Sequence, residues 1–507
     1  MRLKPFQSHE AGSGLAIQLV LPRGACRRWH LAIAVNLAAA GHGVSVTRVA
    51  TTAREPAALA LLRLTEQTLF SSRAIGAADF GAPVADGAFD PYCTGGHPNL
   101  TIDLSGREAP PASRIPVLQP LFNRSPDDLA LFDGLLGNRP ASIEWRRIDD
   151  GAILADGVAA VTAPHILTQG FSEALSLAVV LVDRAVLAAR NAPGDRSTAS
   201  IRSMARPASS ARLTGFALGS LAERLLARLT TAVTTSRQWN IAWRTDHPGR
   251  GIVETATLDL AGFRWLERDS ARYFADPFPV AYQGHTYLFC EEYPYARGKG
   301  HLSFMEIFSD GTHGAIRPML EADHHLSYPC IFSHGGQIWM IPETAEAGTL
   351  DLYRAERFPD RWVRHKTLLD NCYFADATFF EHAGRCWIAA TAPAFGQSDR
   401  DSLSLFMSDR PDGDWMAHPM NPVVADVAGS RPAGWVERCA DGLRRPAQDC
   451  TGGYGWGLTI ARIDRLTPYD YAETRLVRIH PPAAIDAVGL HSVNRGGGIE
   501  VIDAIVP

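Results

Sequence analysis

Residues 275–292 read ADPFPVAYQGHTYLFCEE, and this stretch decides the fold because two later segments repeat its pattern. The later segments are SYPCIFSHGGQIWMIPET at 327–344 and ADATFFEHAGRCWIAATA at 375–392. In all three, a glycine stands nine residues after the first position and an aromatic residue follows three positions later. The glycines are Gly284, Gly336 and Gly384. Each segment therefore predicts a strand, a tight glycine turn and a second strand.

Two weaker copies follow these segments. They are AGWVERCADGLRRPAQDC at 433–450 and LHSVNRGGGIEVIDAI at 490–505. The second positions of the five copies lie 48 to 58 residues apart. A four-stranded propeller blade takes about 40 to 50 residues plus loops, and a ring of such blades leaves few exposed sheet edges. Residues 238–507 are therefore predicted to form an all-β five-bladed propeller.

The N-terminal part has a different pattern. An apolar strand from Leu15, a helical segment and a second strand at 42–50 form a βαβ opening, and further buried strands are expected at 99–106 and 115–121. Strands that alternate with helices favour a parallel sheet. We expect an α/β domain over 1–190, with a linker and an amphipathic helix over 191–237, where Ser, Ala, Arg and Pro are frequent at first. The chain as a whole is predicted to be multidomain.

The composition of the chain limits the classes of function that it can have. A chain of 507 residues with 46% hydrophobic and 20% charged residues can bury more than one core. The net charge of -5 gives no electrostatic reason to expect nucleic acid. Because no apolar run is long enough for a signal peptide or an integral membrane segment, a cytoplasmic location is expected. The eight cysteines show no CxxC pair, so neither a metal site nor a cofactor is predicted.

Acidic residues recur at repeat positions that a propeller brings together. The first strand of every blade lines the central channel. Asp276, Asp376 and His491 share the second repeat position, while Glu291 and Glu343 end the next strand. Carboxyls that converge raise one another's pKa, and glycosidic chemistry uses one carboxylic acid with one carboxylate. We predict Asp276, Asp376 and Glu343 as catalytic, and Glu291 and His491 as substrate-binding.

The structural alternative is that an Asp at a strand start bonds backbone amides in a turn. Tyr328 and Gly434 replace the Asp in the second and fourth copies, which favours a site over a purely structural repeat. The aromatic positions Tyr287, Trp339 and Trp387 suit a blade core better than a sugar-stacking surface.

Four further residues are predicted to bind substrate from loops or strand ends. They are Arg431 in SRPAG, Arg445 and Gln448 in RRPAQDC, and Tyr454 in GGYGWG. The two Arg side chains and Gln448 can bind anionic or hydroxyl-rich groups, whereas the glycines around Tyr454 let the backbone approach a ligand. A loop anchor is the alternative for the Arg residues, and a plain loop or bulge is the alternative for GGYGWG.

Several motifs in order resemble a known family. FADPF, YLFCEE, LSYPCIF, RPAGW, RRPAQDC and GYGWGLTIARIDRLTPYDYAE resemble the N-terminal propeller domain of glucosamine inositolphosphorylceramide transferases and its bacterial relatives. The resemblance covers 238–507 and implies a five-bladed propeller similar to those of arabinanase- and fructosidase-type glycosidases. It implies a sugar or glycoconjugate substrate whose glycosyl unit is bound and then cleaved or transferred. The alternative is a non-catalytic glycan-binding module that assists a partner glycosyltransferase.

The first domain resembles the formyltransferase fold. NLTIDLSG and FDGLLGNRPASIEWRRIDDGAILADG match the order of that family's elements, and Asp149 and Asp150 stand where its catalytic Asp lies. The family also needs a His after the fourth strand, where this chain has VLQPLFNRSPDD. The resemblance therefore implies a degenerate, non-catalytic relative. Formyl transfer to an amino sugar remains an alternative that requires a His near Asp149 and Asp150.

Overall fold

A computed structural model describes residues 14–50, 57–70, 79–92, 97–108, 115–191, 210–219, 237–393, 398–481 and 486–506. The described chain divides into two compact units. One contains the described residues up to 219 together with Ser398, and the other contains the described residues of 237–393 and 399–506. Most of the expected linker, namely 192–209 and 220–236, lies outside the described residues.

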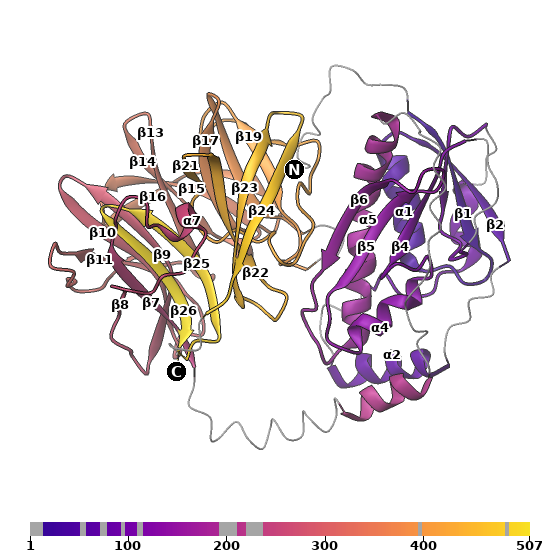
Figure 1. The fold of residues 1–507 in the computed structure, drawn as a ribbon, viewed down its shortest axis with the longest axis horizontal. Helices are drawn as coiled ribbons and strands as arrows, with labels where there is room; N and C mark the ends of the chain where they lie inside the picture. Colours follow the sequence, from indigo (N-terminus) through magenta and orange to yellow (C-terminus); the bar gives the residue numbers. More distant parts are fainter. Residues whose placement is uncertain are drawn as a thin grey trace. The chain divides into compact units, whose positions relative to one another are not determined.

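The first unit is built on a six-stranded sheet of order β2-β1-β3-β4-β5-β6 (Figure 1). Its strands are β1 (Ala16–Pro22), β2 (Gly43–Val49), β3 (Leu100–Asp103), β4 (Val117–Phe122), β5 (Ala141–Arg147) and β6 (Ile153–Ala159). The expected parallel pairing holds for β2, β1, β3 and β4. It is wrong for β5 and β6, which pair antiparallel. The short turn between these two strands leaves no room for the crossover that parallel pairing needs.

The helices of this unit pack on the sheet and on one another. They are α1 (Arg28–Ala39), α2 (Ala57–Phe70), α4 (Leu131–Leu135) and α5 (Leu167–Asn191), with the short 3₁₀ helices η1 (Asp86–Tyr92) and η2 (Asp128–Ala130). Helix α5 packs against β5 and β6, where the buried Trp145 donates to the Ala178 carbonyl at 3.0 Å. Glu66 of α2 accepts the first N–H groups of α5 from Leu167 and Thr168, each at 2.9 Å. None of the described helices is long and apolar enough to cross a bilayer.

The second unit is a five-bladed propeller, as predicted (Figure 1). Its sheets have the orders β12-β11-β10-β9, β13-β14-β15-β16, β17-β18-β19-β20, β21-β22-β23-β24 and β25-β26-β7-β8. The first two contain β9 (Arg272–Tyr282), β10 (His285–Pro294), β11 (His301–Ile307), β12 (Arg317–Leu320), β13 (Ser327–His334), β14 (Gln337–Glu343), β15 (Thr349–Arg357) and β16 (Arg361–Asp370). The third contains β17 (Ala375–His382), β18 (Arg385–Thr391), β19 (Ser404–Ser408) and β20 (Met416–Ala417).

The remaining strands complete the ring. The fourth sheet contains β21 (Glu437–Cys439), β22 (Gly442–Asp449), β23 (Gly457–Leu466) and β24 (Tyr471–Ile479). The fifth contains β25 (Gly489–Gly496), β26 (Ile499–Val506), β7 (Gln238–Thr245) and β8 (Arg264–Trp265). Short helices α7 (Ile252–Thr255) and η3 (Ala345–Ala347) lie in the connections. Because β26 pairs with β7, segments from both ends of the propeller share one sheet.

The repeat glycines form the inner hairpin turns. Tyr282 pairs with His285, which leaves Gln283 and Gly284 as a two-residue loop with φ of 50° and 86°. Two positive φ values in a two-residue loop are typical of a type I′ turn. The same pattern occurs at Gly335–Gly336, Ala383–Gly384 and Gly497–Gly498. In the fourth sheet, by contrast, Gly442 is the first residue of β22.

The repeated aromatic positions belong to the core, as expected. Trp339 and Trp387 are 7% and 1% exposed and lie in hydrophobic clusters formed by the blades. Tyr287 packs against the same cluster as Trp339.

Candidate functional site

The second position of the first three repeats is an irregularity of the inner strand. Asp276, Tyr328 and Asp376 have φ of 51°, 45° and 53°. The pairing registers of β9, β13 and β17 shift beside them. Such a bulge re-aims the side chain, and Asp tolerates the left-handed region better than most residues. All three side chains are buried.

Asp276 lies among backbone amides and a histidine. Its Oδ2 accepts the Tyr328 N–H at 3.2 Å, and its Oδ1 lies 3.8 Å from Nε2 of His491. His491 in turn contacts Asp503 through Nδ1 at 2.7 Å. Burial raises the pKa of Asp276 to about 7, an effect that His491 opposes and the charges of Asp376 and Asp503 reinforce. Asp276 is therefore poised to exchange a proton near neutral pH.

Asp376 is more completely paired. Its Oδ2 accepts hydrogen bonds from Nε of Arg431 at 2.6 Å and from Nε2 of Gln448 at 2.9 Å. Its backbone N–H donates to Oε2 of Glu343 at 3.1 Å. Burial raises the pKa of Asp376 to about 7, against the Arg431 charge, and a hydrogen bond with the Glu343 carboxyl raises it further. Asp376 and Glu343 thus form a carboxyl pair beside a guanidinium.

Glu343 is the last residue of β14, and Glu291, at the matched repeat position, lies three residues before the end of β10. Burial raises the pKa of Glu343, an effect that the Arg431 charge and the hydrogen bonds with Asp376 oppose and the Asp276 charge reinforces. Burial also holds the pKa of Glu291 well above its usual value, with added effects from Asp276 and Glu343. Because these carboxyls act on one another's pKa, they lie in one poorly solvated region.

Tyr454 forms a more exposed part of the same region. The Arg431 guanidinium lies 5.0 Å from its ring centroid. His491 lies edge-on to the ring at 5.5 Å and stacks on Trp239 at 3.7 Å. With 37% of its surface exposed, Tyr454 is accessible to a ligand.

Arg445 is not brought to the carboxyls. It pairs with Glu473 at 2.7 Å and donates to the Gly429 carbonyl at 2.6 Å. Arg445 and Gln448 are three residues apart on β22, so alternation along the strand places them on opposite faces. This explains why Gln448 reaches Asp376 and Arg445 does not.

Three site residues were missed, although the repeats contain their signal. Three positions before the second repeat position stand Tyr273, His325, Tyr373 and Arg431. Tyr273 and His325 contact Oε1 of Glu291 at 3.4 and 3.5 Å. The Tyr373 hydroxyl and Nη1 of Arg431 both donate to Oδ2 of Asp399, at 3.2 and 3.1 Å. Only Arg431 was predicted, because this position precedes the first residue of each repeat.

Asp276, His491 and Asp503 each offer one ligand atom within 4.8 Å of the others. Both oxygens of Asp503 are already used: Oδ1 accepts the N–H groups of His491 and Ser492, and Oδ2 accepts that of Asp276. We therefore interpret this group as a hydrogen-bonded support for Asp276.

In the first unit, Asp150 stabilises the turn between β5 and β6. It pairs with Arg147 and accepts the Ala152 N–H at 3.0 Å. A role as a turn cap was one of the two expectations for Asp149 and Asp150. The formyltransferase resemblance stays a prediction.

Comparison with known proteins supports the family resemblance that the sequence motifs of the second unit indicated. Residues 246–482 match the family model described as "Glucosamine inositolphosphorylceramide transferase 1, N-terminal". The family resemblance is thereby confirmed for the propeller. The protein of this name from Arabidopsis thaliana is 32% identical over 240 residues, which cover 46% of this chain and 30% of the relative. Its counterpart from Oryza sativa subsp. japonica is 31% identical over 237 residues, again 46% and 30%. The match thus spans less than a third of these relatives.

Solved structures of glycoside hydrolases show a weaker similarity. A family 117 glycoside hydrolase from Zobellia galactanivorans has a TM-score of 0.34 at 12% identity, covering 47% of this chain and 87% of its own. An α-L-arabinofuranosidase from Podospora anserina has a TM-score of 0.34 at 12% identity, covering 55% and 99%. The propeller assignment rests on the strand order of the five sheets and not on these scores.

Proposed function

We propose that the second unit binds a glycan or glycoconjugate at the carboxyl-lined end of its channel and cleaves or transfers one glycosyl unit. One observation carries the proposal. Asp276 and Asp376 stand at equivalent repeat positions, both are buried, and both have a pKa of about 7 in one electrostatically coupled group. Structural turn carboxylates that accept amide hydrogen bonds have lowered pKa values instead.

The environments of the carboxyls suggest separate roles. Asp276 has no Arg or Lys contact among the described residues, so its ionised form is a base or nucleophile toward the anomeric carbon. Burial raises the pKa of Glu343 against the Arg431 charge, which makes Glu343 the candidate to protonate the leaving oxygen. Asp376 positions Arg431 and shares a hydrogen bond with Glu343. A proton donor and a carboxylate are what glycosyl cleavage or transfer requires.

Exposed tyrosines around this group suit a sugar ligand. Tyr373 and Tyr454 are 41% and 37% exposed, and Tyr295, at 45%, lies 6.2 Å from the ring of Tyr273. An aromatic ring offers an apolar face and, in Tyr, a hydroxyl. A sugar presents the complementary combination of C–H faces and hydroxyls.

The relatives' name specifies glucosamine transfer to an inositolphosphorylceramide. For this chain we propose only that a glycosyl unit is cleaved or transferred. An amino sugar is the first glycosyl unit to test. The competing function is glycan binding without turnover, in support of a partner glycosyltransferase. Both functions predict that the site binds a sugar, but only the first predicts turnover.

The test compares turnover of a panel of 4-nitrophenyl glycosides, including the glucosaminide, by wild type, Asp276→Asn and Glu343→Gln. We expect each variant to lose at least about 100-fold in kcat/KM, the usual contribution of an acid or base. Asp351→Asn is the matched control because Asp351 is a buried carboxylate of β15 that bonds Thr349 and Thr367 instead of the site. Its turnover should equal that of wild type.

Calorimetric titration with the corresponding free sugars separates the alternatives. Binding by wild type without turnover on any glycoside would establish the binding module. Turnover that is unchanged in both variants would overturn the proposed site.

A further inference from the structure

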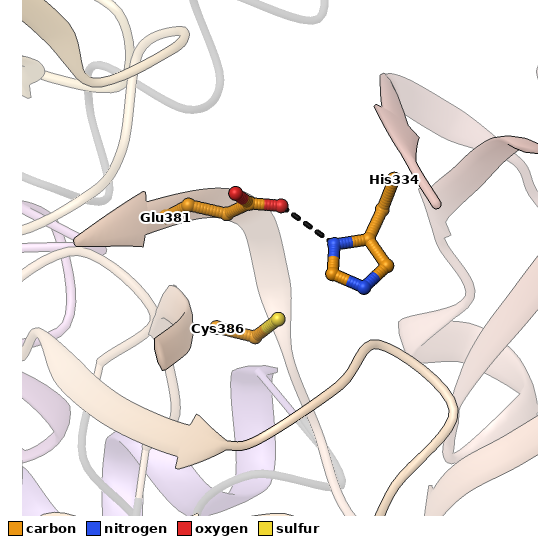
Figure 2. A group of neighbouring side chains, drawn as sticks. All are labelled: His334, Glu381 and Cys386. Atoms are coloured by element: carbon orange, nitrogen blue, oxygen red, sulfur yellow. Dashed lines mark hydrogen bonds and ion pairs between the residues drawn. The ribbon is translucent and has the colours of Figure 1, made fainter. Parts of the chain in front are cut away.

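A second group of side chains converges between the second and third sheets. His334 is the last residue of β13, Glu381 lies on β17 and Cys386 on β18. One ligand atom of each residue lies within 4.8 Å of the other two. Figure 2 shows the imidazole, the carboxylate and the thiol pointing into one common space. The cluster of carboxyl side chains at the candidate catalytic site consists of other residues.

Burial differs among the three side chains. Nδ1 of His334 lies 2.7 Å from Oε1 of Glu381, and these side chains are 33% and 53% exposed. Cys386 is only 2% exposed, and its thiol has no hydrogen-bond partner within the described part of the chain. A buried thiol packs as a small apolar group, and Cys386 does so within a hydrophobic cluster. The observation that points to a ligand is its sulfur facing an imidazole and a carboxylate.

The backbone holds the group in place. Glu381 and Cys386 are directly paired across the β17–β18 hairpin, so their side chains leave the same face of the sheet. His334 comes from the neighbouring blade, at the start of the Gly335–Gly336 turn. Two adjacent hairpins therefore supply three ligands from rigid positions.

We propose that His334, Glu381 and Cys386 bind a Zn²⁺ ion, with water as the fourth ligand. Nitrogen, oxygen and sulfur donors together are typical of zinc, which is borderline soft. A tetrahedral site with usual bond lengths needs ligand atoms ~3.5 Å apart. The proposal requires small rotations of the His334 and Glu381 side chains to reach that spacing around the buried sulfur.

Binding of Zn²⁺ at this site balances in charge and in protons. On binding, the Cys386 thiol loses its proton to solvent, and the His334 proton moves from Nδ1 to Nε2, so that Nδ1 can coordinate. The thiolate and the Glu381 carboxylate then neutralise the dication, and the imidazole is neutral.

The ion would connect two blades at the edge of a cavity. Glu381 also lines a cavity of about 610 Å³ that is bounded by the later halves of β9, β13 and β17. Asp276 and Asp376 stand in the first halves of β9 and β17, and Glu343 pairs with Ser327 at the start of β13, so this cavity lies toward the other end of the channel. Zinc bound here would join the second and third sheets.

The chain contains a matched control. Nδ1 of His285 lies 2.6 Å from Oε1 of Glu306 in the first sheet, which is a similar partly exposed pair. This pair is not part of either described group of three potential ligands. Comparison of the two pairs isolates the contribution of the buried thiol.

The experiment titrates the full chain, freed of metal by a chelator, with Co²⁺ as a spectroscopic substitute for Zn²⁺. We expect a thiolate-to-cobalt charge-transfer band in the near ultraviolet that one equivalent of Zn²⁺ abolishes. Cys386→Ser should remove the band, whereas Cys439→Ser should keep it. His334→Gln should weaken zinc binding at least about tenfold, and His285→Gln should leave it unchanged.

Thermal melting shows whether a variant that fails to bind metal is still folded. Without metal, Cys386→Ser should melt close to wild type, and Zn²⁺ should raise the Tm of wild type only, because the ion binds the folded state. Three outcomes would overturn the proposal: the absence of a charge-transfer band, a band that persists in Cys386→Ser, or equal zinc affinities for His334→Gln and His285→Gln. If Cys386→Ser does not fold, the comparison of the two His variants decides the question.

Discussion

Asp276 and Asp376 occupy equivalent repeat positions but differ in how their charge is compensated. The Arg431 guanidinium and the Gln448 amide contact Asp376 directly. Asp276 has the Tyr328 N–H and a more distant imidazole. A buried carboxylate without a close cation lowers stability, whereas removal of one partner from a buried ion pair leaves the other uncompensated. The same substitution should therefore stabilise the fold less at Asp376 than at Asp276.

Asp276→Asn should raise the free energy of unfolding by about 1–2 kcal/mol at pH 8, as other substitutions of strained site residues do. The folded pKa of about 7 lies above the usual value for an aspartic acid side chain. The protonated carboxyl thus favours the fold, and this contribution is lost as the pH rises through 7. The gain from Asn should be largest above pH 7 and much smaller at pH 5. Urea unfolding at both pH values measures it, and a gain that does not depend on pH would contradict the raised pKa.

Asp376→Asn should raise the free energy of unfolding at pH 8 by less than Asp276→Asn does, because Arg431 stays buried with a weaker set of partners. The double variant Asp376→Asn, Arg431→Met should be more stable than this single variant. Chemical denaturation of the three variants measures the differences. An equal gain from Asp376→Asn and Asp276→Asn would show that Asp399, which also contacts Arg431, compensates the guanidinium alone.

At the scale of the element, the inner hairpins depend on turn residues whose backbone has the left-handed conformation. Gly284 has a φ of 86°, and a Cβ there would meet nothing within 4 Å. Gly284→Ala should therefore cost about 1–2 kcal/mol through backbone conformation alone. Gln283→Asn should gain about 0.5 kcal/mol, because Asn is preferred at the first position of a type I′ turn. Thermal melts of both variants check the signs. If Gly284→Ala were neutral, the turn type would be wrong.

Features encoded by local chemistry could be predicted from the sequence. Three hairpins were located because a type I′ turn needs glycine at a fixed offset. The acidic positions 276, 291, 343 and 376 were found because a repeat fixes which residues share a face. The antiparallel pairing of β5 and β6 was not found, because alternation of apolar residues does not distinguish the two pairings.

Other features depend on contacts that spacing does not reveal. Arg445 and Gln448 could not be separated without the register that sets which face of β22 meets the channel. His334 and Glu381 lie 47 residues apart, so their convergence with Cys386 has no short sequence motif. The buried support of Asp276 by Asp503 likewise joins the first and fifth sheets.

At the scale of the whole molecule, the fifth sheet closes the ring. Strand β7, at the start of the propeller, lies between β26 and β8, so two segments about 250 residues apart share one sheet. This closure removes the exposed edges that an open array of blades would have. Opening of the ring at the β26–β7 ladder should therefore be an early event in unfolding.

A disulfide across that ladder tests the closure. Thr245 and Ile499 are paired residues of β7 and β26, and joining them as Thr245→Cys, Ile499→Cys closes a loop of roughly 250 residues. On chain entropy this disulfide should raise the free energy of unfolding by up to about 5 kcal/mol, compared with about 2 kcal/mol for a short hairpin loop. The matched control is Ala281→Cys, Thr286→Cys across the β9–β10 hairpin. Denaturation of each variant in oxidised and reduced form gives the two gains. A larger gain from the hairpin disulfide would show that the ring does not open at the β26–β7 ladder when the propeller unfolds.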